Sequence, residues 1–105
     1  MSVLGNRTSR RFAVRSKARL KSGSRRAVSG LLIELSIDGC RISNVDHARF
    51  AVGQTARIEL DGFEPLDGLV RWSHDGLVGL RFARSLSAAA LQSLLHSCRP
   101  QAVAA

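Results

Sequence analysis

Short runs of alternating apolar and polar residues, separated by turn signals, fill most of the chain. In one of them Ala56, Ile58 and Leu60 alternate with charged residues, which is the pattern of a strand with one buried face. Asp-Gly pairs at 61–62 and 75–76 are typical of tight turns between strands. We expect strands over 13–20, 27–36, 39–43, 55–60, 66–72 and 78–82. Short strands at this spacing predict a mainly β protein, a small antiparallel barrel that is fully or partly closed.

A helix is expected after the last strand. Ser87 is suited to be its N-cap, and Pro100 would end it. Apolar residues recur between these two positions at helical spacing, namely Leu91, Leu94, Leu95 and Cys98. This narrow apolar stripe predicts that the helix caps the open end of the barrel, and a contact between two copies of the chain is the alternative.

The length of 105 residues suits one domain with a single core. We expect a flexible basic arm over 1–9, a barrel with its helix over 10–98, and a disordered tail over 99–105. No apolar run approaches the roughly 20 residues of a membrane span, and the N-terminus lacks the apolar core of a secretory signal, so we expect a cytoplasmic location. Cys40 and Cys98 are too few for a disulfide framework or a metal cluster, and we expect them to be unpaired.

The positive charge of the chain is concentrated near its N-terminus. Residues 1–26 carry seven Arg and two Lys with no acid, which gives +9, whereas residues 27–105 carry seven Arg against eight acids, which gives −1. Such a segment indicates an anionic partner without identifying it. Of the 16 cations 14 are Arg, whose planar guanidinium suits bidentate recognition of phosphate or guanine.

The stretch from Leu31 to Ser43 is the best candidate for a site. It begins as a mostly apolar run, breaks at the Asp-Gly pair 38–39 and resumes as an alternating run, which predicts strand, tight turn and strand. The period of two along a strand places Glu34 and Ser36 on one face of the sheet. Gly39 would let a ligand approach the backbone closely.

Two sequence signatures resemble those of the PilZ domain family. Glu34, Ser36 and Gly39 match the family's second signature, an acidic or amide residue, any residue, Ser, two residues of any kind and Gly, although the family has Asp or Asn at the first position. The first signature is two Arg, three residues of any kind and Arg, and it is matched by Arg10, Arg11 and Arg15. The signatures occur in the family's order, with 18 residues between Arg15 and Glu34.

The resemblance covers residues 10 to about 95, and the run from Gly79 to Phe82 is similar to the family's final strand. It implies a six-stranded β-barrel that binds the bacterial second messenger cyclic di-GMP. The ligand-binding residues it implies are Arg10, Arg11, Arg15, Glu34, Ser36 and Gly39.

The chemistry of guanine suits such a set of residues. A carboxylate such as Glu34 can accept from guanine N1–H and N2–H together, while Arg side chains bind the phosphates and the acceptor edge formed by O6 and N7. Ser36 is assigned a phosphate or base contact. For Glu34 the alternative is a surface ion pair with Arg41 across the turn, and for Ser36 and Gly39 it is an ordinary role within the turn.

Trp72 is the only tryptophan, and its position at the end of a strand makes it a candidate for stacking on a base. The alternative is a core or rim residue, because we expect it to share a face with Leu66, Gly68 and Val70. We interpret His74 and Asp75 as part of a solvated turn, since neither has a partner at metal-ligand or catalytic spacing.

The sequence contains no nucleophile elbow, phosphate-binding glycine-rich helix start or zinc spacing, so we expect neither enzyme activity nor a metal or other cofactor. The leading interpretation is a stand-alone receptor for cyclic di-GMP that relays the signal to an unidentified protein effector. One alternative is a degenerate protein of the same fold that acts as an adaptor without binding nucleotide. Another is a small basic nucleic-acid-binding barrel, which the scarcity of aromatic residues disfavours.

Overall fold

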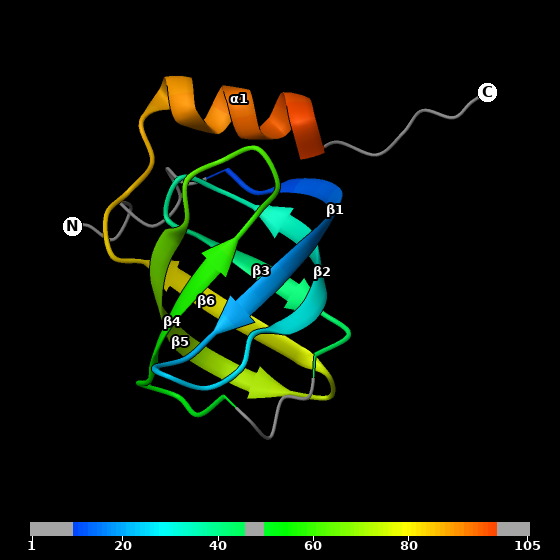
Figure 1. The fold of residues 1–105 in the computed structure, drawn as a ribbon. Coiled ribbons are helices and arrows are strands. Elements are labelled where there is room, and N and C mark those ends of the chain that lie inside the picture. Colours follow the sequence, from blue (N-terminus) through cyan, green and yellow to red (C-terminus); the bar gives the residue numbers. More distant parts are fainter. Residues whose placement is uncertain (1–9, 46–49, 99–105) are drawn as a thin grey trace.

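In the computed structural model, which describes residues 10–45 and 50–98, the alternating runs form strands and the periodic C-terminal segment forms a helix (Figure 1). The elements in chain order are β1 (Phe12–Lys21), β2 (Val28–Leu35), β3 (Gly39–Ser43), β4 (Thr55–Glu59), β5 (Leu66–His74), β6 (Leu77–Phe82) and α1 (Ala88–Cys98). The strands pair in the order β1-β2-β3-β6-β5-β4, every pair is antiparallel, and β1 closes on β4. The predicted six-stranded antiparallel barrel with a C-terminal helix is confirmed.

Alternating residues along the strands fill the interior of the barrel. In β4, Ala56 and Ile58 are buried while Arg57 between them is exposed, as the sequence predicts. The largest fully buried side chains come from all six strands and from the helix: Leu20, Leu32, Leu35, Ile42, Ile58, Val70, Val78 and Cys98. Closure pairs both edges of the sheet, so neither is left open to another chain.

The hairpin between β5 and β6 is tighter than the sequence suggests. Only Asp75 and Gly76 form its turn, with φ angles of 52° and 77°, so β5 continues to His74. Positive φ at both central residues is the requirement of a type I′ turn, which matches the twist of the strands that it joins. The strand predicted over 66–72 is therefore two residues longer.

The helix α1 lies across one end of the barrel (Figure 1). It begins where Ser87 caps it, because the backbone N–H of Ala90 donates to Ser87 Oγ at 3.0 Å. Leu94 and Cys98 on its inner face are buried, which confirms the predicted cap on the barrel end. No helix in residues 10–45 and 50–98 combines the length and the apolar character that a membrane crossing requires.

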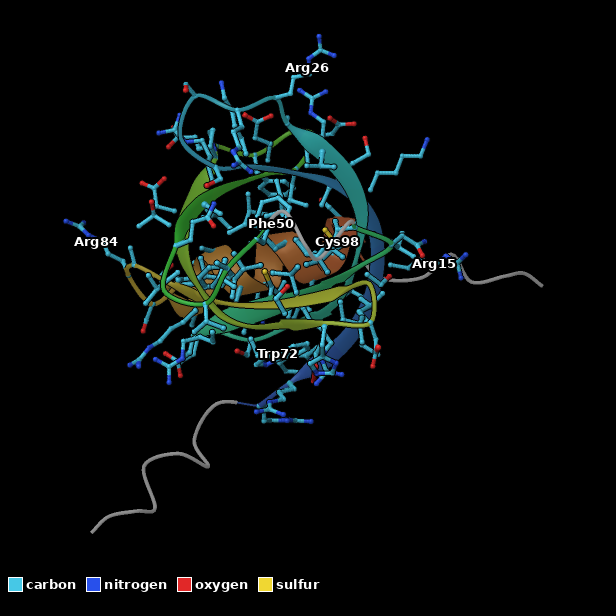
Figure 2. The ribbon with its side chains drawn as sticks, turned by 90° about the horizontal axis from the view of Figure 1, so that it is seen from below. Arg15, Arg26, Phe50, Trp72, Arg84 and Cys98 are labelled. Carbon is cyan, nitrogen blue, oxygen red and sulfur yellow. The ribbon has the colours of Figure 1, made fainter. Side chains whose placement is uncertain are left out.

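The connection between β3 and β4 also contributes to the core. Val45 and Phe50 are buried although the sequence around them shows no alternation, and Figure 2 shows Phe50 inside the ring of strands. Cys40 and Cys98 are free and buried, as expected. The predicted arm over 1–9 and tail over 99–105 lie outside the described residues.

Candidate ligand-binding site

The strand register places five residues side by side on the outer wall of the barrel. Successive cross-strand partners, from β1 through β2, β3 and β6 to β5, are Ala13, Glu34, Arg41, Gly79 and Trp72. Hereafter these five residues are the outer row. Neighbouring strands lie about 4.8 Å apart, so their side chains can contact one another although they span 60 positions of sequence, from 13 to 72.

Trp72 is on the outside of the barrel, so the prediction that it shares a face with Val70 is wrong. The pairing of β5 with β6 shifts between Val70 and Trp72, which leaves Arg71 as an extra residue on β5. Such a bulge moves every later side chain to the opposite face. Trp72 therefore lies over Gly79, and Figure 2 shows it outside the ring of strands.

Gly79 provides the space that the indole of Trp72 occupies. A Cβ atom at position 79 would lie 2.7 Å from Trp72 Cζ2 and closer still to two other atoms of the ring. The indole ring also stands 5.1 Å from the ring of His74, with an angle of 33° between the planes. Trp72 is thus held against the wall and keeps part of its surface in solvent.

Arg41 links Glu34 to Trp72. Its Nη2 atom lies 3.0 Å from Glu34 Oε1, and its Cζ atom lies 5.5 Å from the centroid of the Trp72 ring. The side chains of Arg41 and Glu34 are 38% and 23% exposed. The alternative considered for Glu34, an ion pair with Arg41, is therefore present in this structure. Sequence reasoning missed the contact between Arg41 and Trp72, because it depends on the pairing of strands that are distant in the chain.

Ser36 organises the turn between β2 and β3 and lies just beyond the end of β2. Its Oγ accepts hydrogen bonds from the backbone N–H groups of Asp38 and Gly39, both at 3.2 Å, and its own N–H donates to the carbonyl of Gly39 at 2.9 Å. Ser36 is 9% exposed. These contacts are those of a turn-capping hydroxyl, so its geometry also fits the structural role considered from the sequence.

Gly39 is required by the neighbouring strand. A Cβ atom at this position would overlap the carbonyl oxygen of Leu80 on β6 and would lie 3.2 Å from the Cα of Arg81. Because these are backbone atoms, no side-chain rotation could remove the overlap. The fold therefore requires glycine at position 39 whether or not a ligand approaches the backbone there, as the sequence predicts.

Asp38 joins the same turn to the segment after β6. The N–H of Phe82 donates to the backbone carbonyl of Asp38 at 2.8 Å, and Ser85 Oγ donates to Asp38 Oδ1 at 2.8 Å. The N–H of Leu86 donates to the carbonyl of Ile37, also at 2.8 Å. The turn 36–39 is thereby held in place by a segment more than 40 residues further along the chain.

The first-signature arginines lie at the beginning of β1, beside this turn. Phe12 is opposite Leu35 and Ala13 is opposite Glu34, so Arg11 precedes a strand that runs directly along the Glu34 side of β2. The Arg10 Cζ atom is 5.1 Å from the ring centroid of Phe12. Arg15 falls in a register shift of β1 next to Ile33 and is exposed. The start of β1 and the end of β2 with its following turn thus bring the two signatures side by side.

The side chains that could bind a metal ion form no cluster in the described part of the chain. No group of three or more His, Cys, Asp and Glu residues is close enough to hold a metal ion within residues 10–45 and 50–98. His74 Nδ1 lies 3.3 Å from Asp75 Oδ2, and both side chains are largely exposed, as predicted, but His74 is the last residue of β5 and only Asp75 belongs to the turn.

Fold and site together define a class of protein: a small closed antiparallel barrel whose candidate ligand site is on the outer wall, beside a basic N-terminal segment. The sequence model of the PilZ domain matches residues 5–99 of the chain. The chain therefore belongs to the PilZ domain family, whose members are receptor domains for cyclic di-GMP. A comparison with curated protein sequences finds no significant match.

Proposed function

We propose that this chain is a stand-alone receptor that binds cyclic di-GMP on the outer wall of the barrel, in the bacterial cytoplasm. The supporting observation is the β1–β2 register, which sets Ala13 opposite Glu34 and so brings the beginning of β1 against the turn 36–39. Arg10 and Arg11, immediately before β1, are within a few residues of Glu34 across the ladder. Cations and a carboxylate are thus available together for one guanine nucleotide.

Glu34 accepts from the N1–H and N2–H groups of one guanine in this proposal, and it must leave Arg41 to do so. An ion pair as exposed as Glu34–Arg41 is worth at most about 1 kcal/mol. Two hydrogen bonds from guanine to a carboxylate are worth roughly 1.5–3 kcal/mol each. The exchange therefore favours the ligand, and the Arg41 guanidinium is then available for a phosphate or for the O6/N7 edge of guanine.

Arg10, Arg11 and Arg15 bind phosphate and the acceptor edge of guanine, and Trp72 provides a surface on which a base stacks. Ser36 acts in this proposal mainly by shaping the turn, because its hydroxyl already accepts from two backbone N–H groups. The N-terminal segment orders on the bound ligand, and the newly formed surface changes the affinity for a protein effector. No enzymatic step is part of this function.

Isothermal titration calorimetry with cyclic di-GMP tests the proposal. The native chain is expected to bind at micromolar ligand concentration. Arg11→Ala should weaken binding by about tenfold or more, because a charge-assisted contact worth roughly 1.5–3 kcal/mol is lost. Arg25→Ala is the matched control, since Arg25 is an exposed arginine in the turn at the other end of β1. No binding by the native chain, or equal binding by Arg11→Ala, would overturn the proposal.

A second candidate function is a protein-interaction adaptor that has lost nucleotide binding. The observation that favours it is the engagement of Glu34 with Arg41, at a position where the family has Asp or Asn. Glu34→Asp would then create binding that the native chain lacks. Binding by the native chain that Glu34→Asp leaves unchanged or weakens excludes the adaptor.

A further inference from the structure

A basic groove lies on the outer surface of β4, β5 and β6. It extends from the β1–β2 turn at Gly23 to Ser85 and has a volume of about 920 Å³. The charged residues that line it are four cations and one acid: Lys21, Arg57, Arg71, Arg81 and Asp67. Hereafter this surface is the basic groove. It lies outside both signatures, and no property of the candidate site accounts for its charge.

The strand register sets like charges opposite each other in the basic groove. Lys21 is the direct cross-strand partner of Arg57, and both side chains are exposed. Like charges at directly opposite positions destabilise a sheet. Asp67, opposite Arg57 on the other side, compensates only in part, because Arg57 Nε and Asp67 Oδ1 are 3.5 Å apart at the surface. The pairing of Lys21 with Arg57 thus costs stability in the free protein. An anion bound between the two cations would offset this cost.

The floor of the basic groove favours a peptide over a nucleic acid. Half-buried Leu69 lies between Thr55 and Arg81 in the register and offers an apolar contact between charged side chains. The aromatic residue that lines the groove, Phe82, is only 6% exposed, so no ring is available for stacking on bases. Residues 1–9 and 99–105 of the chain contain no acid, so charge complementarity does not favour them as occupants.

We propose that the basic groove binds an acidic segment of a partner protein, one that carries apolar side chains between its carboxylates. The carboxylates pair with Lys21, Arg57, Arg71 and Arg81, and the apolar side chains contact Leu69. Electrostatic complementarity of this kind raises the association rate and makes binding dependent on salt concentration.

The basic groove and the candidate nucleotide site share one cation. Arg81 lines the groove and is also the cross-strand partner of Gly39, so this residue connects the two surfaces. Ser85, at the end of the groove, donates to Asp38 in the turn 36–39. A dianionic ligand at Gly39 therefore competes with the acidic segment for Arg81, and each weakens the binding of the other by the same factor. This step rests on the proposed binding of cyclic di-GMP, whereas binding of the peptide does not.

Fluorescence anisotropy with a short labelled peptide of Asp-Leu-Glu repeats tests the first step. We expect the peptide to bind the full chain at low salt and its affinity to fall as salt is added. The double variant Lys21→Glu/Arg57→Glu should lose about tenfold or more of the affinity. Its matched control is Lys17→Glu/Arg19→Glu, which makes the same change of net charge on exposed strand residues outside the groove. Circular dichroism establishes that both variants are folded.

Equal losses of peptide affinity in the two double variants would show that the peptide is attracted only by the net charge of the chain, and this would overturn the proposal. Absence of peptide binding to the native chain would overturn it as well. An oligothymidylate probe that binds more tightly than the peptide and loses affinity in Lys21→Glu/Arg57→Glu would assign the groove to nucleic acid instead.

Adding cyclic di-GMP to the peptide complex tests the second step. We expect the apparent affinity for the peptide to fall by about threefold or more, consistent with usual coupling free energies. If calorimetry shows nucleotide binding and the peptide affinity is unchanged, the proposed competition is refuted. The proposed binding of the acidic peptide to the basic groove is unaffected by that result. If the nucleotide does not bind at all, the proposed function fails, and the comparison of the double variants still decides on the groove.

Discussion

Replacing Gly79 with alanine tests how Trp72 is held on the outer wall of the barrel. Gly79 lies between Val78 and Leu80, which point into the core, so its own Cβ position points outward under the indole. An added methyl group would overlap three atoms of the ring. The ring must then leave its place over β6, and its contact with the Arg41 guanidinium would change with it.

The structure sets the size and the sign of this effect. Alanine in a strand is normally favoured over glycine by roughly 0.5–1 kcal/mol, because it has less backbone entropy to lose on folding. Forcing extra volume into a filled site costs about 1–3 kcal/mol. We therefore expect Gly79→Ala to lower the free energy of unfolding by a net ~1 kcal/mol, within a range of about 0–2.5 kcal/mol. In a Trp72→Ala background the overlap disappears, and the same change should be neutral or stabilising by roughly 0.5–1 kcal/mol.

Urea unfolding of the native chain, the two single variants and the double variant completes a double-mutant cycle. Circular dichroism must be the probe, since Trp72 is the only tryptophan and its fluorescence is lost in two of the four proteins. We expect a coupling free energy of about 2 kcal/mol between positions 72 and 79. If Gly79→Ala is as costly without the indole as with it, the strain is in the backbone and our account of the outer row is wrong.

Three further predictions concern the turn, the core and the helix. Gly39→Ala should destabilise the barrel more than Gly79→Ala does, because the methyl group would meet the backbone of Leu80 rather than a movable ring, and thermal unfolding measures this. Burial raises the pKa of the Cys40 thiol from 9.0 to about 12, so between these pH values the folded state keeps a proton that the unfolded state loses. The free energy of unfolding of the native chain should therefore fall between about pH 9 and pH 12. Urea titrations should show this fall for the native chain and not for Cys40→Ala. Ser87→Ala should lower the free energy of unfolding by about 1 kcal/mol, because the N-cap hydrogen bond is lost. Ser87→Asp should keep most of the native stability, because aspartate can also cap the helix.

Local patterns predicted the barrel well, because most of its strands obey a simple period of two. Ala56 and Ile58 are buried where alternation places them, and the turn at Asp75 and Gly76 has the positive φ angles that an Asp-Gly pair allows. The face of Trp72 could not be predicted in this way. One extra residue in the pairing of β5 with β6 inverts the pattern, and an inserted residue looks like any other in the sequence.

In the candidate site, only contacts between residues close in sequence could be predicted. The Glu34–Arg41 pair lies within one hairpin, so its possibility follows from the turn between β2 and β3. The contact of Arg41 with Trp72 requires β3 and β5 to flank β6, an arrangement that depends on the pairing of β3 with β6, which are distant in the chain. Phe50 is a similar case, since its burial depends on the opening that the strands leave rather than on its neighbours in the chain.

The glutamate at position 34 makes best physical sense as one half of a pair with Arg41. An aspartate is one methylene shorter, so it would hold its carboxylate closer to the wall, where the family's second signature places an acid or an amide. The longer side chain reaches a guanidinium that also lies over Trp72. Because the pair is partly exposed, it is worth at most about 1 kcal/mol, which a ligand's hydrogen bonds can offset. In the proposed complex a guanine that takes the place of Arg41 on Glu34 would therefore meet a guanidinium already positioned at the centre of the outer row.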